Sequence, residues 1–372
     1  MITISSLIEA IQNKISFAGE QLKKCLEYRR KLPESSRNFP FVTRKGKWVW
    51  ADKWSNGFFI GQLLCMYQLD GNPWWIEEAD RHIDALKIYR HRGDFQDIGY
   101  ILYYSYALGY TITGNSHYRD IALEGADSLF EAMMEGGYLK CKWLEDGEHY
   151  AGIDSLMNIQ LWLWAYRETG IAAYRESALR CIRHAIRVLV RPDGATYEYV
   201  RVDPRSGEWI ESFNKNAARP DSVWARGQAW AIYGLIQAYL VLGESSIIPV
   251  IENLTEYYAR HAHTDLIPCW DLLMRDSDTL VDASAASVIA SALLQYAPIS
   301  PDSKYAKWGE SLLERLLSPE YQPNPEKGHE GILLHASTPL SVVSTPGESQ
   351  SWGDYFLLEA MYSYRSGRSE KL

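Results

Sequence analysis

The sequence is poor in cysteine, with only Cys25, Cys65, Cys141, Cys181 and Cys269 among 372 residues. An odd number of scattered cysteines, none in CxxC spacing, argues against a disulfide framework and against a zinc cluster. Such usage is typical of a reducing compartment, so we expect a cytoplasmic protein.

The sequence also has no excess of positive charge, and we expect neither a membrane span nor a signal peptide. The net charge is −9, so an anionic ligand would have to meet a local Arg or Lys, and a nucleic-acid partner is not expected. Residues 1–31 form an amphipathic pattern without the apolar core and cleavage site of a signal peptide. The uncharged runs 227–243 and 283–301 contain Gln, Ser, Gly or Pro and predict buried helices, so no membrane partner is expected either.

Several catalytic signatures are also missing from the sequence. It contains no GxSxG nucleophile elbow, no glycine-rich phosphate loop and no GxGxxG after a strand. His261 and His263 stand close together but lack a third ligand or a clustered carboxylate. We therefore expect no metal site and no bound cofactor.

An internal repeat organises the chain. The frame Tyr-x3-Gly-x3-aromatic-x3-Ala starts at Tyr67, Tyr110 and Tyr166, and a copy with aliphatic residues in the last two places starts at Tyr239. Glycine readily adopts the left-handed conformation that ends a helix, so each copy predicts a helical hairpin. The segment before each glycine is apolar nearly all round, whereas the segment after it is amphipathic, as in residues 176–190.

These hairpins predict an all-α (α/α)6 barrel of six inner and six outer helices. The apolar inner helices start near Asn56, Asp97, Asp154, Arg226, Asp282 and Asp354. Amphipathic helices lie between them, and the N-terminal helix supplies the sixth outer one. We expect a single domain over residues 1–372, with the strand-like stretches 196–203 and 331–337 in loops between hairpins.

The N-terminal ends of the inner helices share one face of such a barrel, and each carries polar or aromatic residues. A single Asp at such an end is most simply explained as a helix cap. The convergence of six ends favours a carbohydrate site instead, because indole rings gather there: Trp54, Trp143, Trp224, Trp230, Trp270 and Trp352. Asp97 and Asp154 are the best pair for acid–base chemistry, since apolar surroundings and a neighbouring carboxylate raise a carboxyl pKa. Arg226 could bind a substrate anion.

The motifs on this frame resemble glycoside hydrolase family 88, the unsaturated glucuronyl hydrolases, nearly from end to end. The resemblance rests on KWSNG (53–57), DIGY (97–100), GIDS (152–155), WARGQAW (224–230) and WGDY (352–355). It implies a hydrolase that releases a Δ4,5-unsaturated uronic acid from the non-reducing end of a lyase-generated disaccharide or longer oligosaccharide, from a glycosaminoglycan or a similar polymer. Protonation at C4 of the enol ether and addition of water at C5 would open the ring, with no metal and no cofactor.

The resemblance also implies roles for particular residues. Asp154 matches the family's general acid/base, and Asp97 matches the partner that assists it and holds sugar hydroxyls. That Arg226 binds the uronate carboxylate is our own hypothesis. The full set of predicted substrate-binding residues is Trp54, Gln96, Trp143, Glu198, Asn216, Arg226, Trp230 and Trp270.

Three of these residues depart from the family pattern. Gln96 stands where the family often has a His, and Glu198 stands where the family has a His in a loop. The family also has a Gln in the loop before the RGQAW helix, and Asn216 is the residue closest to that position in this sequence. These departures concern the part of the site that reads the leaving sugar. Whether Glu198 takes over water activation from the His stays open.

Two other functions stay open at the level of the sequence. One is a direct inverting glycosidase, which needs two carboxylates about 6.5–9.5 Å apart on either side of a saturated glycosidic bond. The other is a non-catalytic sugar-binding barrel, which would be favoured if Asp154 were only a buried helix cap.

Overall fold

The computed structural model describes residues 4–141, 147–274, 280–300, 302–337 and 347–369. The chain forms two compact units. Unit 1 comprises residues 1–86, 263–268 and 278–372, and unit 2 comprises residues 87–262 and 269–277. Among the described residues, no helix is both long enough and apolar enough to pass through a membrane.

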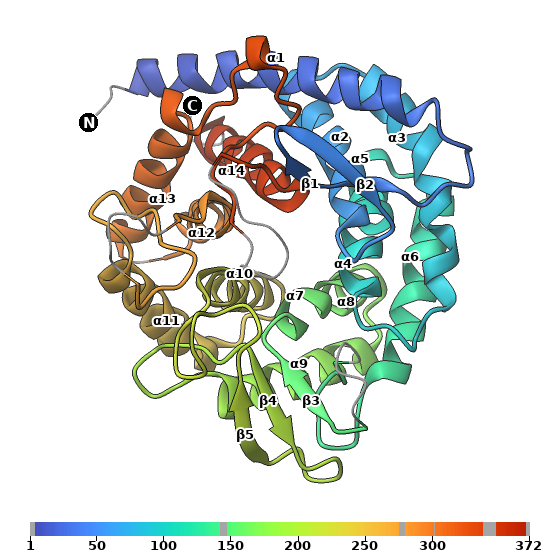
Figure 1. Ribbon diagram of the computed structural model, residues 1–372. Helices are drawn as coiled ribbons and strands as arrows, with labels where there is room; N and C mark the ends of the chain where they lie inside the picture. Colours follow the sequence, from blue (N-terminus) through green and yellow to red (C-terminus); the bar gives the residue numbers. More distant parts are fainter. Residues whose placement is uncertain (1–3, 142–146, 275–279, 301, 338–346, 370–372) are drawn as a thin grey trace. The chain divides into compact units, whose positions relative to one another are not determined.

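Unit 1 is built from two sets of helices and one hairpin. The buried set packs α12 (Ala283–Tyr296) against α14 (Ser351–Ser369), and α14 against α2 (Asn56–Asp70). The covering set consists of α1 (Ile4–Arg29) and α3 (Trp74–Ile83) on α2, and α13 (Ser303–Leu316) on α12. Strands β1 (Phe39–Arg44) and β2 (Lys47–Ala51) pair in antiparallel fashion (Figure 1).

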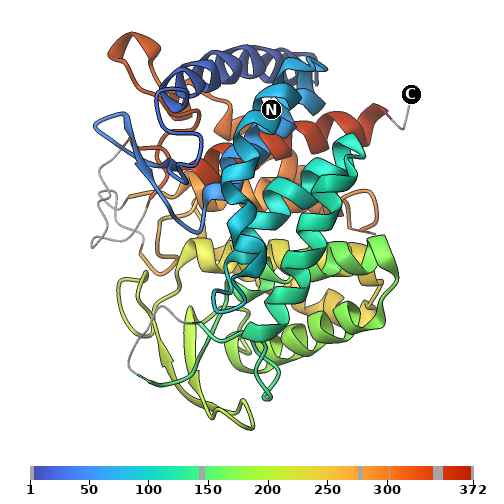
Figure 2. The ribbon, with the colours of Figure 1, turned by 90° about the vertical axis from the view of Figure 1, so that its right-hand side faces the viewer.

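Unit 2 repeats this arrangement with more irregular inner helices, most of which are buried. These are α4 (Ile98–Leu102), α5 (Leu108–Thr113), α7 (Ser155–Asn158), α8 (Gln160–Thr169) and α10 (Ala225–Leu242). The covering helices α6 (Ser116–Ser128), α9 (Ala172–Leu189) and α11 (Ile248–His261) pack on α8, α8 and α10, respectively. A three-stranded antiparallel sheet of this unit is ordered β3 (Tyr150–Gly152), β4 (Tyr199–Val202) and β5 (Trp209–Phe213), as labelled in Figure 1. Figure 2 shows the same region of the chain turned by 90°.

The predicted hairpin turns are confirmed. Gly71, Gly114, Gly170 and Gly243 have φ angles of 73°, 71°, 71° and 65° and end α2, α5, α8 and α10 in the left-handed conformation. Five of the six predicted inner helices begin within one residue of the predicted position, whereas α14 begins three residues earlier, at Ser351. The repeat therefore gave correct helix ends because the glycine conformation is a local property.

The irregularities of the inner helices were not predicted. The helix that follows Asp97 changes to π-helical geometry at Tyr103–Ala107, and the helix that follows Asp154 is interrupted at Ile159. Short π segments are frequent at functional sites. Both interrupted helices carry a candidate catalytic aspartate at their start.

The strand expectations were partly right. Residues 196–203 contain β4 and lie between α9 and α10 as predicted, but residues 331–337 form no strand. The backbone amides of Ile332 and Leu333 instead donate to the buried carboxylate of Asp354 at 2.9 Å each. A side chain distant in sequence thus satisfies these amides, which an alternating pattern cannot reveal.

Candidate active site

Asp97 and Asp154 stand directly before α4 and α7 in unit 2, yet neither carboxylate caps its helix. Asp282, at the start of α12 in unit 1, does cap: it accepts from the backbone amides of Ser284 and Ala285. Helix capping, the simplest explanation for such an Asp, therefore applies to Asp282 and fails for the two candidates. Their carboxylates are oriented by other contacts.

Asn158 connects the two aspartates. Its Nδ2 donates to Asp97 Oδ1 at 3.2 Å and to the carbonyl oxygen of Asp154 at 3.3 Å. Its Oδ1 accepts from the backbone amide of Tyr100 at 3.0 Å. Because Asn158 is fully buried, these bonds fix α4 against α7. Asn158 was not among the predicted site residues, although its position four after Asp154 places both on one helix face.

Gly99 allows the two helices to touch. A Cβ atom at this position would lie 2.3 Å from the carbonyl oxygen and 2.5 Å from the Cα of Asn158. Real Cβ contacts are longer than this, and the obstacle is backbone, which cannot rotate away. The glycine of the DIGY motif is therefore required by the close approach of α4 to α7.

The two carboxylate oxygens of Asp154 have different surroundings. Gln96, which is buried, donates from Nε2 to Asp154 Oδ2 at 3.3 Å. Asp154 Oδ1 is buried without a hydrogen-bond partner among the described residues. It lies over Gly152, where a Cβ atom would be 2.4 Å away. One oxygen is thus held by Gln96, while the other is a buried acceptor that no described residue satisfies.

Burial raises the pKa of Asp154 to about 6, although the amides of Asp154 itself and of Ser155 oppose the shift. Burial also raises the pKa of the Tyr100 hydroxyl well above its ordinary value, and the charges of Asp154 and Asp97 add to the effect. Tyr100 therefore remains a proton-bearing donor at neutral pH. A carboxyl that keeps its proton near pH 6 suits general acid catalysis.

Arg226 and Trp230 join this group from the first turns of α10. The Arg226 guanidinium lies 4.7 Å from the centroid of the Trp224 ring, in a cation–π contact. Trp230 packs edge-on against Tyr100, with ring centroids 5.9 Å apart and planes at 63°. Burial raises the pKa of Tyr100, and the positive charge of Arg226 opposes part of this rise.

Glu198 organises Asn216. Its Oε2 accepts from the backbone amides of Lys215 and Asn216 at 2.7 and 2.6 Å, and its Oε1 accepts from the Asn216 side chain. Burial raises the pKa of Glu198 to about 7 against these hydrogen bonds, and the charge of Asp154 contributes to the rise. Glu198 is thus electrostatically coupled to Asp154 while its oxygens bind the loop.

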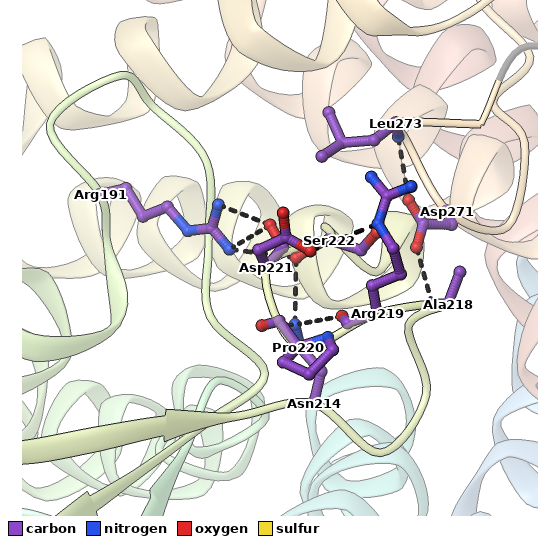
Figure 3. Close-up of polar contacts among 9 residues, drawn as sticks. All are labelled: Arg191, Asn214, Ala218, Arg219, Pro220, Asp221, Ser222, Asp271 and Leu273. Carbon is purple, nitrogen blue, oxygen red and sulfur yellow. Dashed lines mark hydrogen bonds and ion pairs between the residues drawn. The ribbon is translucent and has the colours of Figure 1, made fainter.

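The loop of residues 214–222 is fixed from several sides, as Figure 3 shows. Asn214 Nδ2 donates to the carbonyl oxygens of Arg219, Pro220 and Ser222, at 3.2, 2.8 and 3.1 Å. The Arg191 guanidinium donates to the carbonyl oxygens of Asp221 and Ser222. Asn216 is therefore presented on an ordered support.

The segment that carries Trp270 also contacts the loop of residues 214–222. Asp271, fully buried, accepts from the amides of Ala218 and Leu273 at 2.8 and 2.9 Å (Figure 3). The carbonyl oxygen of Trp270 accepts from the amide of Ala225 at the start of α10, at 3.0 Å. Asp271 was not among the predicted site residues, because nothing in CWD distinguishes a loop anchor from a ligand.

The predicted stacking residues also include Trp54 and Trp143. Trp54 belongs to unit 1, where its ring contacts Trp352 at 4.8 Å and Phe58 at 6.1 Å between centroids. Trp143 lies outside the described residues. Within the described ranges, no group of three or more His, Cys, Asp or Glu side chains could hold a metal ion.

The fold consists of hairpins that pair a buried helix with an amphipathic one. Two carboxylates that cap no helix, an arginine and indole rings lie at the starts of the buried helices, as is typical of a carbohydrate-active enzyme. The chain belongs to Glycosyl Hydrolase Family 88, whose family model matches residues 28–366. It is therefore a glycoside hydrolase.

The chain is also similar to individual hydrolases of known type. The chain is 30% identical over 325 residues to an unsaturated chondroitin disaccharide hydrolase of Streptococcus agalactiae serotype III (strain NEM316), covering 84% of this chain and 81% of the relative. It is 26% identical over 353 residues to an unsaturated glucuronyl hydrolase of Bacillus sp. (strain GL1), covering 91% and 94%. The crystal structure of an unsaturated glucuronyl hydrolase specific for heparin matches with a TM-score of 0.91 at 28% identity, over 97% of this chain and 98% of that one. The predicted fold class, an all-α (α/α)6 barrel, is confirmed.

Proposed function

We propose that this chain releases the Δ4,5-unsaturated uronic acid from the non-reducing end of lyase-generated oligosaccharides. The observation that carries the proposal is Asp154: its carboxyl is not a helix cap, its pKa is raised to about 6, and its Oδ1 is a buried oxygen without a hydrogen-bond partner among the described residues. The names of the family relatives support the substrate class.

In the proposed reaction, Asp154 donates its proton to C4 of the enol ether. The positive charge that develops at C5 is shared with the ring oxygen, and a water molecule adds at C5. The carboxylate left on Asp154 accepts the proton of that water, so the residue is restored. The resulting hemiketal opens and releases the remaining sugar, without a covalent enzyme intermediate.

The surrounding residues have supporting roles in this proposal. Asp97, fixed by Asn158, accepts hydrogen bonds from sugar hydroxyls and holds the sugar against Asp154. Arg226 binds the uronate carboxylate, for which the forked guanidinium is geometrically suited. The indole rings of Trp54, Trp143, Trp230 and Trp270 pack against the sugars, while Gln96, Glu198 and Asn216 form the side that reads the leaving sugar.

A panel of unsaturated disaccharides from chondroitin, hyaluronan, heparin and bacterial exopolysaccharides tests the proposal. We expect at least one of them to lose the ultraviolet absorbance of its C4=C5 bond when the protein is added. A panel in which every member keeps its absorbance would refute the proposed reaction.

The alternatives are less well supported. The non-catalytic sugar-binding barrel required Asp154 to be a buried cap, and its side chain makes no cap hydrogen bond. The direct inverting glycosidase remains the competing reaction, because it uses the same types of residue on the same fold. Saturated glycosides distinguish it, since a hydration reaction leaves them intact.

The pH dependence should follow Asp154. The acid must be protonated, so kcat/KM is expected to fall as the pH rises through about 6, the pKa to which burial raises this carboxyl. Glu198→Gln is the control, because Glu198 also has a raised pKa, of about 7. The falling limb should remain near pH 6 in this variant; its disappearance would assign the limb to Glu198 and contradict the role of Asp154.

We further propose that residues 1–372 act as one catalytic domain in the cytoplasm, on an unsaturated oligosaccharide and without a cofactor. The five cysteines are scattered, odd in number and never in CxxC spacing, which supports a reducing location. Equal activity with and without a chelator is the expected result for an enzyme that needs no metal.

A further inference from the structure

We propose that one face of the sheet β3–β4–β5 binds neutral sugar units of the leaving chain, beyond the sugar that is directly attached to the uronate. This inference rests on the proposed function and extends it to a preferred substrate length. The binding surface consists of the rings of Tyr199, Phe213 and Tyr150, and we call it the aromatic shelf.

Strand pairing places these three rings on a common face. Gly152 of β3 pairs with Tyr199 of β4, and Tyr199 pairs with Phe213 of β5. Tyr150 pairs with Arg201, two residues beyond Tyr199 on the same strand. Side chains of paired residues project to the same side of a sheet, and residues two apart on one strand share that side.

The shelf is continuous with the candidate acid. Gly152 is the point of contact: a Cβ atom there would lie 2.4 Å from Asp154 Oδ1 and 2.9 Å from the Tyr199 ring. The oxygen and the ring therefore meet over this glycine. The raised pKa of Tyr199, to which the charge of Asp154 contributes after burial, agrees with this proximity.

From this contact the rings extend outwards to the surface. The centroid of Phe213 lies 6.1 Å from that of Tyr199, and the centroid of Tyr150 lies 6.4 Å from that of Phe213. Exposure rises along the row, from 8% at Tyr199 to 37% at Phe213. A row of rings that starts at the reacting group and opens to solvent suits the successive sugars of a chain leaving the site.

The charges beside the shelf favour neutral sugars. Arg201 lies on the same face, and its guanidinium is paired with Glu211 at 2.7 Å and Glu148 at 3.1 Å. Two carboxylates against one guanidinium leave an excess of negative charge at this end. A sulfated or uronic unit placed there would be repelled, whereas a neutral hexose would not.

The shelf predicts a dependence on chain length. The wild type should have a lower KM for an unsaturated tetrasaccharide with neutral inner units than for the disaccharide with the same unsaturated end. Phe213→Ala should raise the tetrasaccharide KM about tenfold, the effect of losing one well-placed ring contact, and change kcat little. The disaccharide KM should change by less than about twofold, because a disaccharide does not reach Phe213.

Trp209→Ala is the matched control. Trp209 is an aromatic residue of the same strand and is 49% exposed. It pairs with Val202, whose side chain points to the opposite face of the sheet from Tyr199, so Trp209 lies on that opposite face too. It should leave both KM values unchanged. The proposal would be refuted if Phe213→Ala raised the tetrasaccharide KM and the disaccharide KM equally. It would also be refuted if the wild type had the same KM for both substrates.

Calorimetric binding of the same two oligosaccharides separates failure of the shelf from failure of the proposed function. If no unsaturated substrate is turned over, the proposed function is wrong. Tighter binding of the tetrasaccharide that Phe213→Ala removes would still support the shelf, and equal binding of both sugars would refute it. A tetrasaccharide sulfated on an inner unit should bind more weakly than the neutral one, and tighter binding would refute the preference for neutral units.

Discussion

Asp154→Asn is expected to lower kcat by about 10²–10⁴-fold, the usual contribution of a general acid. The asparagine side chain has nearly the same shape and can still accept from Gln96, but it has no acidic proton to give to C4. KM for an unsaturated disaccharide should remain within a few-fold of wild type, because the sugar contacts are untouched. Initial rates of ultraviolet absorbance loss measure both constants.

The same substitution at Asp282 provides the control for this variant. Asp282 also begins a buried helix, but its carboxylate caps α12 through the amides of Ser284 and Ala285. Asparagine is as good a cap as aspartate, so Asp282→Asn should keep near-normal kcat. A normal kcat in Asp154→Asn, with the cooperative unfolding transition of the wild type, would contradict the assignment of the acid.

Gly99→Ala is expected to lower both stability and activity. The added Cβ atom would lie 2.3 Å from the carbonyl oxygen of Asn158, so α4 and α7 must separate. Overpacking of this kind costs about 1–3 kcal/mol of the free energy of unfolding. A displacement of about 1 Å between Asp97 and Asp154 could lower kcat by as much as about 10²-fold. Urea denaturation and steady-state kinetics measure the two effects.

Gly367→Ala tests whether the loss is specific to the close approach. Gly367 lies in α14, where an added Cβ atom would meet nothing within 4 Å. Alanine is favoured over glycine inside a helix by about 0.5–1 kcal/mol, so this variant should be equally or more stable than the wild type. Equal stability of Gly99→Ala and the wild type would show that the two helices are not in contact as described.

The fold was largely predictable because its signals are local. Each left-handed glycine ends a helix through its own conformation, and the apolar helices are distinguished from the amphipathic ones by composition alone. The π-helical segment at Tyr103–Ala107 and the break at Ile159 could not be predicted in the same way. They depend on how α4 and α7 pack, which neither segment encodes by itself.

The candidate site shows the same division. Asp97 and Asp154 could be singled out because a carboxylate at the start of an apolar helix is conspicuous in the sequence. Asn158 could not be singled out in this way. Its side chain joins its own helix to Tyr100, which lies 58 residues away in the sequence. Sequence alone could not separate Asp282 from Asp154 either, since only the hydrogen bonds distinguish a cap from a candidate acid.

The measurement that tests the central claim most directly compares an unsaturated disaccharide with its counterpart saturated at C4–C5. Sugar release and ultraviolet absorbance are followed together for each. Hydration of the enol ether predicts release from the unsaturated sugar alone, in step with the loss of absorbance, and one deuterium at C4 when the reaction runs in deuterium oxide. Release from the saturated sugar at a comparable rate would contradict the account and establish direct glycoside hydrolysis.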